Sequence, residues 1–199
     1  MIHATETLDP SRARRLKALT HDVHDALDKS VMSAASFASI EGYGRFVQMQ
    51  WAFHSDIDTL YDNAALQAVL PRLKDRRRLA LIEADLADLG LEAPDTAGGP
   101  SFAKGKKVDL PTALGWLYVA EGSNMGAALL RKQAARLGLS DGRGARHLAP
   151  AEAGPAAHWR VFTAALDRVE LSDEEEARVT RGAQAAFARV QALAHACLG

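Results

Sequence analysis

Leu16–Asp28 reads Leu-Lys-Ala-Leu-Thr-His-Asp-Val-His-Asp-Ala-Leu-Asp, and its apolar side chains recur at the spacing of one helical face. The apolar positions are Leu16, Leu19, Val23 and Leu27. Such a stripe predicts a helix that packs one side against a core. Later segments repeat this spacing, and none alternates polar and apolar residues as a half-buried strand does. The sequence therefore predicts an all-α fold, with about six or seven helices in a single domain over residues 1–199.

His24 lies at the edge of this stripe, with Thr20 four positions and Lys17 seven positions before it. On a helix the three side chains point the same way, with Lys17 about 10 Å from His24 along the axis. A neutral imidazole can bind iron, and the lysine could contact an anionic group of the same bound molecule. A histidine at such an edge is more commonly only packed or half-exposed, and His21 could share a metal with His24. The residues alone leave these alternatives open.

The composition describes an ordinary folded protein. Of the 199 residues 48% are hydrophobic and 25% are charged, and the formal net charge is −1. These values argue against disorder and against a general attraction to nucleic acid. Basic residues cluster within 12–17, 72–78 and 104–107. The clusters are either solvated helix ends and a loop, or a positive rim for an anionic ligand or an acidic partner protein.

The single cysteine, Cys197, excludes a disulfide framework or a thiolate metal site within one chain and favours a reducing compartment. The first residues lack the apolar core of a secretion signal. No apolar run approaches the roughly 20 residues that a membrane span needs. We therefore expect a cytoplasmic protein with no membrane contact.

Helix signals divide the chain into segments joined by polar, Gly- and Pro-containing connections. Helices are expected at about 10–29, 40–62, 71–89, 110–137, 155–169 and from 173 onward. Connections are expected at 31–39, 92–107 and 139–154. Asp9, Asp109 and Ser172 are the expected capping residues.

Two polar residues, Gln50 and His54, fall four positions apart inside the apolar stripe of segment 40–62. A buried polar group costs roughly 1–3 kcal/mol unless it is hydrogen-bonded. The pair is either bonded to backbone in the core or lines an internal pocket that holds ordered water.

Segment 110–137 contains Glu-Gly-Ser-Asn-Met-Gly at positions 121–126. A glycine inside a helix costs about 1 kcal/mol relative to alanine, so Gly122 and Gly126 together weaken or kink this helix by about 2 kcal/mol. Either close packing against another helix compensates for this cost, or a flat ligand presses against the bare backbone.

Several separated blocks, taken in order, resemble the bacterial haem oxygenases. The most specific block is residues 115–128, Gly-Trp-Leu-Tyr-Val-Ala-Glu-Gly-Ser-Asn-Met-Gly-Ala-Ala, which is similar to the distal helix of that family. Residues 20–24 resemble the proximal helix, and residues 144–150 and 158–162 are also similar to family segments. The likeness covers nearly the whole chain.

The resemblance implies a haem between the first helix and the Gly-rich helix. His24, not His21, matches the iron ligand. The residues expected to contact the haem or its propionates are Lys17, Thr20 and Tyr118. The distal residues expected to take part in catalysis are Gly122, Ser123 and Gly126, whose main chain lies close over the haem, with Gln50, His54 and less clearly Arg78 in an ordered water network.

The implied reaction converts haem, O₂ and electrons into biliverdin, carbon monoxide and ferrous iron, so haem is both substrate and cofactor. An external reductant is expected, supplied by an electron-donor protein of the ferredoxin or flavoprotein type. We expect cleavage at the alpha position. Animal relatives carry an aspartate in the distal helix, where this chain has Glu121 before Gly122. The groups that relay protons therefore stay open.

Other proteins with this type of fold include cofactor-less oxidases, thiamin-degrading enzymes and di-iron oxidases. A di-iron bundle uses Glu-x-x-His pairs, and no histidine of this chain has a glutamate three positions before it. A haem carrier or store that never degrades its ligand is the alternative from another functional class.

Overall fold

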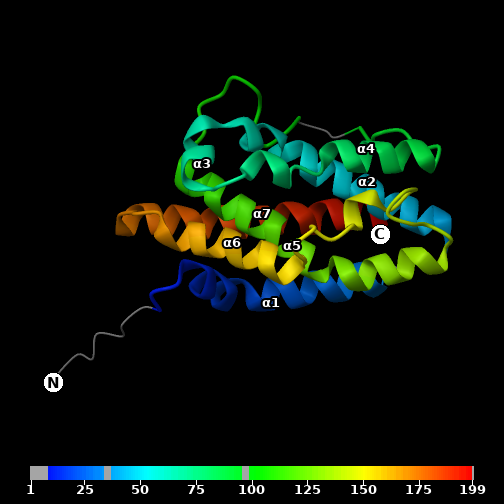
Figure 1. The fold of residues 1–199 in the computed structure, drawn as a ribbon, viewed down its shortest axis with the longest axis horizontal. Coiled ribbons are helices and arrows are strands. Elements are labelled where there is room, and N and C mark those ends of the chain that lie inside the picture. The colour runs from blue at the N-terminus through cyan, green and yellow to red at the C-terminus, as the bar shows by residue number, and fades with distance from the viewer. Residues whose placement is uncertain (1–8, 34–36, 96–98, 199) are drawn as a thin grey trace.

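The computed structural model describes residues 9–33, 37–95 and 99–198, which form a bundle of helices (Figure 1). Within these residues there are α-helices and short 3-10 helices but no strand, which confirms the all-α prediction. The α-helices are α1 Arg12–Ser33, α2 Ile40–Ile57, α3 Ala64–Val69, α4 Leu79–Asp88, α5 Leu110–Arg136, α6 Pro155–Arg168 and α7 Asp173–Leu198. The 3-10 helices are η1 Asp58–Asp62, η2 Leu73–Arg76 and η3 Arg146–Leu148. None of the described helices has the length and apolar character that crossing a membrane requires.

The centre of the bundle is the crossing of α5 and α7, which two glycines bring into close contact. A Cβ at Gly115 would lie 2.2 Å from the carbonyl oxygen of Val179, and a Cβ at Gly182 would lie 2.3 Å from that of Thr112. Any side chain at either position would force the two helices apart. These glycines serve helix packing, and they fix where α5 lies in the molecule.

Helix α5 divides into a buried half and an exposed half. It begins at the expected cap, where Asp109 accepts a hydrogen bond from the backbone N–H of Thr112 at 3.1 Å. Residues 113–121 are all buried, whereas most residues of 122–131 reach the surface. Figure 1 shows the helix changing direction near its middle, although it stays continuous across both glycines. The expected weakening therefore bends α5 without breaking it.

Boundaries of three helices differ from those the sequence predicts. The predicted helix 40–62 narrows to 3-10 geometry after Ile57, and the predicted helix 71–89 begins only at Leu79. Arg72, in the left-handed region with φ 57°, turns the chain after Pro71. The first helix starts at Arg12, because Ser11 rather than Asp9 accepts from a first-turn N–H. It continues past Lys29 to Ser33.

The apolar stripes are correct for most positions and wrong for a few on α1, α4 and α5. The stripe of α2 is buried throughout, and Leu16 is buried on α1. Leu19, Leu81 and Leu129 are 58%, 39% and 52% exposed, so none of them packs in the core. Leu19 and Leu129 belong to the two helices on which the ligand residues were expected.

The interpretation of the basic clusters as solvated ends or a ligand rim is wrong for two arginines. Arg12 is buried, donates to the carbonyl oxygens of Leu166 and Val169 and pairs with Glu176 at 2.6 Å. This contact ties the start of α1 to α6 and α7. Arg76 of η2 is also buried, and its partners belong to the candidate site.

Candidate functional site

Helix α1 presents the side chains that were expected to hold the ligand. The His24 side chain is 53% exposed, and its ring meets Phe187 of α7 edge-on with 6.1 Å between ring centroids. Its Nδ1 lies 4.0 Å from the Asp25 carboxylate. Lys17 is exposed on the same helix, and Thr20 between them is buried. The imidazole is therefore accessible and braced on one side by an aromatic ring.

Thr20 and Tyr118 connect α1 to α5. Their side chains lie close enough for Thr20 to affect the pKa of Tyr118, and the Thr20 hydroxyl donates to the backbone oxygen of Leu16 at 2.8 Å. Burial raises the pKa of Tyr118 to about 12, against a smaller opposite effect of the Thr20 side chain. The phenol therefore stays protonated at neutral pH and can donate a hydrogen bond. This contact brings two of the predicted ligand-binding residues together.

The glycine segment of α5 leaves its backbone open. A Cβ placed at Gly126 would have no atom of the described protein within 4 Å, and one at Gly122 would make an ordinary contact with the Trp159 ring at 3.7 Å. Close packing of helices therefore explains Gly115 but not Gly126. Ser123 is exposed and donates back to the Ala120 carbonyl at 2.7 Å. An open backbone at Gly126 fits a flat ligand better than a helix contact.

A second cluster of polar side chains lies around His54 of α2. His54 is buried, and its Nδ1 has no hydrogen-bond partner within the described residues. Burial lowers the pKa of His54 to about 3, and the neighbouring His147 and Arg78 lower it further. Gln50 is half-buried on the same helix. Among the described residues, no hydrogen bond or ion pair joins Gln50 or His54 to the glycine segment.

His147 of η3 is held by a fully buried carboxylate. Asp85 of α4 accepts from His147 Nδ1 at 2.7 Å and from its backbone N–H at 3.0 Å. Burial alone would raise the pKa of Asp85, but the hydrogen bonds from His147 and Arg146 keep it below its usual value. The carboxylate can only accept, so Nδ1 carries the proton and the buried Nε2, which has no partner in the described protein, is left as an acceptor.

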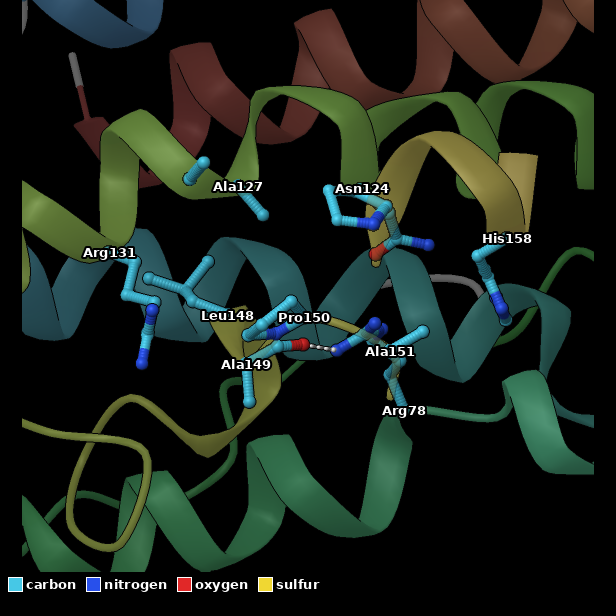
Figure 2. Close-up of a pocket in the computed structure, with 11 residues that line it drawn as sticks. Arg78, Asn124, Ala127, Arg131, Leu148, Ala149, Pro150, Ala151 and His158 are labelled. Atoms are coloured by element: carbon cyan, nitrogen blue, oxygen red, sulfur yellow. Dashed lines mark hydrogen bonds between the residues drawn. The ribbon is translucent and has the colours of Figure 1, made fainter. Parts of the chain in front are cut away.

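Two cavities border the 146–151 segment. One of them lies between this segment and α5 and is shown in Figure 2. The other has a volume of about 190 Å³ and lies between the segment and residues 75–81, and both cavities are lined by Arg78 and His158. Arg78 donates to the carbonyl oxygens of His147 and Ala149 at 2.6 and 3.1 Å. Burial lowers the pKa of Arg78, although Glu121 opposes this effect.

Sequence reasoning did not identify the buried ion pair beside the glycines. Glu121 pairs with Arg76 at 2.7 Å, and the two side chains are 2% and 4% exposed. His158 Nε2 lies 3.5 Å from the same carboxylate. The available signal was Glu121 itself, because a charged residue directly after the apolar run 113–120 needs a buried partner if it continues the same buried segment.

Within the described part of the chain, no three or more His, Cys, Asp or Glu side chains come together in a way that could hold a metal ion. His21, the alternative ligand, has its Nε2 3.7 Å from the Asp25 carboxylate. The imidazoles of His24 and His21 are both accessible on α1, and a single imidazole suits an iron that brings its own equatorial ligands.

Known proteins resemble this chain over nearly its whole length. A sequence model of the Heme oxygenase family matches residues 11–196. The chain belongs to the haem oxygenase family. The heme oxygenase PigA of Pseudomonas aeruginosa is 44% identical over 178 residues, which cover 89% of this chain and 88% of that protein. A heme oxygenase of Neisseria meningitidis, solved with NO and CO bound, matches with a TM-score of 0.88 and 40% identity, covering 95% of this chain and 92% of that one.

Membership of the haem oxygenase family confirms the class of protein and of reaction that the sequence resemblance implied. Members of this family are enzymes that degrade haem, and the matches extend over nearly the full length of both partners. The all-α fold is shared with the Neisseria enzyme. The roles of individual residues stay predictions.

Proposed function

We propose that this haem oxygenase binds haem between α1 and the second half of α5 and converts it with O₂ and electrons into biliverdin, carbon monoxide and ferrous iron. The observation that supports this placement best is the open main chain of Gly126 on a helix linked to α1 through Thr20 and Tyr118. Exposed Leu19 and Leu129 add apolar surface on the same two helices, as a porphyrin requires.

We assign iron ligation to His24. Phe187 packs against one edge of the imidazole and restricts its rotation, and Asp25 lies within electrostatic reach of Nδ1. A ring held in this way has a restricted orientation, which suits a metal ligand. His21 lies three positions earlier on the helix, and its Nε2 is 3.7 Å from the same Asp25 carboxylate.

We assign the haem propionates to Lys17, Thr20 and Tyr118. Lys17 is an exposed cation two helical turns from His24, which suits a carboxylate at the edge of a porphyrin. The Tyr118 phenol keeps its proton at neutral pH and can donate to the same group. These contacts would fix the rotation of the ring about the iron, and so which meso carbon is oxidised; we propose the alpha position.

The distal side is formed by the main chain of Gly122, Ser123 and Gly126. Bound haem iron supplies O₂ activation, using electrons from an external reductant. Steric contact with the bare backbone restricts the direction from which O₂ can reach the porphyrin. Because the Ser123 hydroxyl is engaged with Ala120, we give this residue a main-chain role.

We propose that Gln50, His54 and Arg78 order the water that delivers protons. With a pKa of about 3, His54 is a neutral imidazole at physiological pH, so it positions water instead of acting as a cationic acid. The buried His54 Nδ1 and His147 Nε2 have no partner in the described protein, and ordered water commonly satisfies such atoms.

The reaction consumes electrons, so we propose an electron-donor protein of the ferredoxin or flavoprotein type as a partner. We also propose a cytoplasmic location, supported by the single cysteine of the sequence, which suits a reducing compartment.

The test adds hemin to the purified protein, then ascorbate or a reductase system in air, while the Soret band is followed. We expect the band to decay and biliverdin to accumulate. A Soret band that persists under these conditions, with no biliverdin, would favour the carrier function.

A further inference from the structure

Glu121 stands at the junction between the two halves of α5. It is the last residue of the buried run 113–121, and its side chain is 2% exposed. The next residue is Gly122, and from there the helix reaches the surface. Whatever holds Glu121 therefore holds the point from which the glycine segment extends.

Arg76 attaches this junction to two other elements at once. From η2 its Nη1 donates to the Glu121 carboxylate at 2.7 Å, and its Nη2 donates to the backbone oxygen of His158 at 3.1 Å. The guanidinium carbon lies 5.5 Å from the centroid of the Phe162 ring of α6. His158 Nε2 approaches the same carboxylate at 3.5 Å. The contacts join η2, α5 and α6 around one buried charge pair.

A buried ion pair is a poor source of net stability, because removing both charges from water offsets most of their attraction. What the pair does fix is orientation. The N–H groups of the guanidinium point outward in one plane, so the carboxylate has to lie in that plane. A rotation or slide of α5 at Glu121 would move the carboxylate out of it and leave two charges buried and unpaired. The pair therefore specifies the rotation of α5 more strongly than an apolar contact of the same size would.

We propose that Glu121 and Arg76 are positioning residues that set how the main chain of Gly122–Gly126 lies over the porphyrin, and thereby which meso carbon is oxidised. The inference rests on the proposed function, since it assumes that haem lies under this segment. Neither side chain is required to touch the haem. Their effect passes through the orientation of α5.

The test compares Glu121→Gln with Asp56→Asn. Asp56 of α2 is a matched control, because its carboxylate is also buried and pairs with Arg189 of α7 at the same distance, 2.7 Å, away from the glycine segment. The full-length proteins are loaded with hemin, the biliverdin isomers are separated after turnover, and thermal unfolding is measured on each protein. Wild-type turnover is established first, so that a failure of the proposed function is recognised separately.

We expect both variants to unfold at lower temperature than wild type, and only Glu121→Gln to change the isomer ratio, with turnover reduced by up to about a hundredfold. An isomer ratio in folded Glu121→Gln equal to that of wild type would overturn the inference. So would an equal change in Asp56→Asn.

If Glu121→Gln does not fold, the double replacement Arg76→Met with Glu121→Leu removes both charges and leaves no isolated ion in the core. We expect this protein to fold and to give a changed isomer ratio. A wild-type isomer ratio in the double variant would overturn the inference.

Discussion

His24 and His21 lie almost one turn apart on α1, with side chains 53% and 63% exposed, and they make a natural pair of test and control. We expect His24→Ala to lose the Soret spectrum of histidine-ligated hemin and to bind hemin at least about tenfold more weakly. His21→Ala should keep both. Hemin titrations followed by absorbance measure the effect, and added imidazole should restore the spectrum of His24→Ala. An unchanged spectrum in His24→Ala would refute the ligand assignment.

The type of a residue and its neighbours in sequence reveal only part of the candidate site. His24 could be singled out only through the family resemblance, because an imidazole at the edge of an apolar stripe is more commonly only packed or half-exposed. Arg76 could not, because its neighbours in sequence are also basic and a run of charges is usually solvated. Only the tertiary structure brings Glu121, 45 positions away, to its guanidinium. Pairing across such a separation leaves no local signal in the sequence.

At the scale of the element, two glycines of α5 have different expected roles: Gly115 serves helix packing and Gly126 serves ligand binding. Gly126→Ala introduces a Cβ into open space and removes the cost of glycine in a helix, so we expect stability to rise by about 0.5–1 kcal/mol. The same Cβ would project into the proposed porphyrin site, so hemin turnover should fall at least about tenfold. Denaturant unfolding and the turnover assay measure the two effects.

Gly115→Ala is the contrasting variant, because its Cβ would meet backbone of α7 at 2.2 Å. We expect it to be severely destabilised, since two packed helices would have to separate. Wild-type turnover in Gly126→Ala would show that the open backbone is not the haem site.

Element boundaries were predictable where a side chain caps a helix and not where the backbone takes a rare conformation. Asp109 and the Ser172–Glu175 capping box lie at the starts of α5 and α7 as expected. The break between α3 and α4 depends on a left-handed conformation at Arg72, which a non-glycine residue adopts only in a few cases. Propensity could not indicate it.

At the scale of the whole molecule, α5 borders two groups of candidate site residues. Its Thr20–Tyr118 contact reaches α1 and the expected iron ligand, while Asn124 and Ala127 line a cavity that Arg78 also borders (Figure 2). The family resemblance supplied both groups from sequence. Their position beside a single helix follows only from the fold, because the segments concerned lie far apart along the chain.

The buried histidines make the stability of the whole fold depend on pH. The pKa of His54 falls from 6.5 to about 3 on folding, so at acidic pH the unfolded chain binds more protons than the folded protein. The stability that is fully present above pH 6.5 is therefore lost as the pH falls toward 3. Between pH 6.5 and 5 the loss from His54 alone is about 2 kcal/mol. Burial also lowers the pKa of His147, which adds to the slope in the same window.

The carboxylates whose pKa values are lowered, such as Asp85 and Asp88, affect stability only at more acidic pH, because their values in the unfolded chain are near 4. Urea unfolding between about pH 7.5 and pH 5 therefore isolates the histidines. We expect His54→Gln, which cannot titrate, to lose about 2 kcal/mol less than wild type over this range. Parallel pH profiles for the two proteins would mean that His54 is solvated, and the proposed ordering of distal water by a neutral buried imidazole would then lose its physical basis.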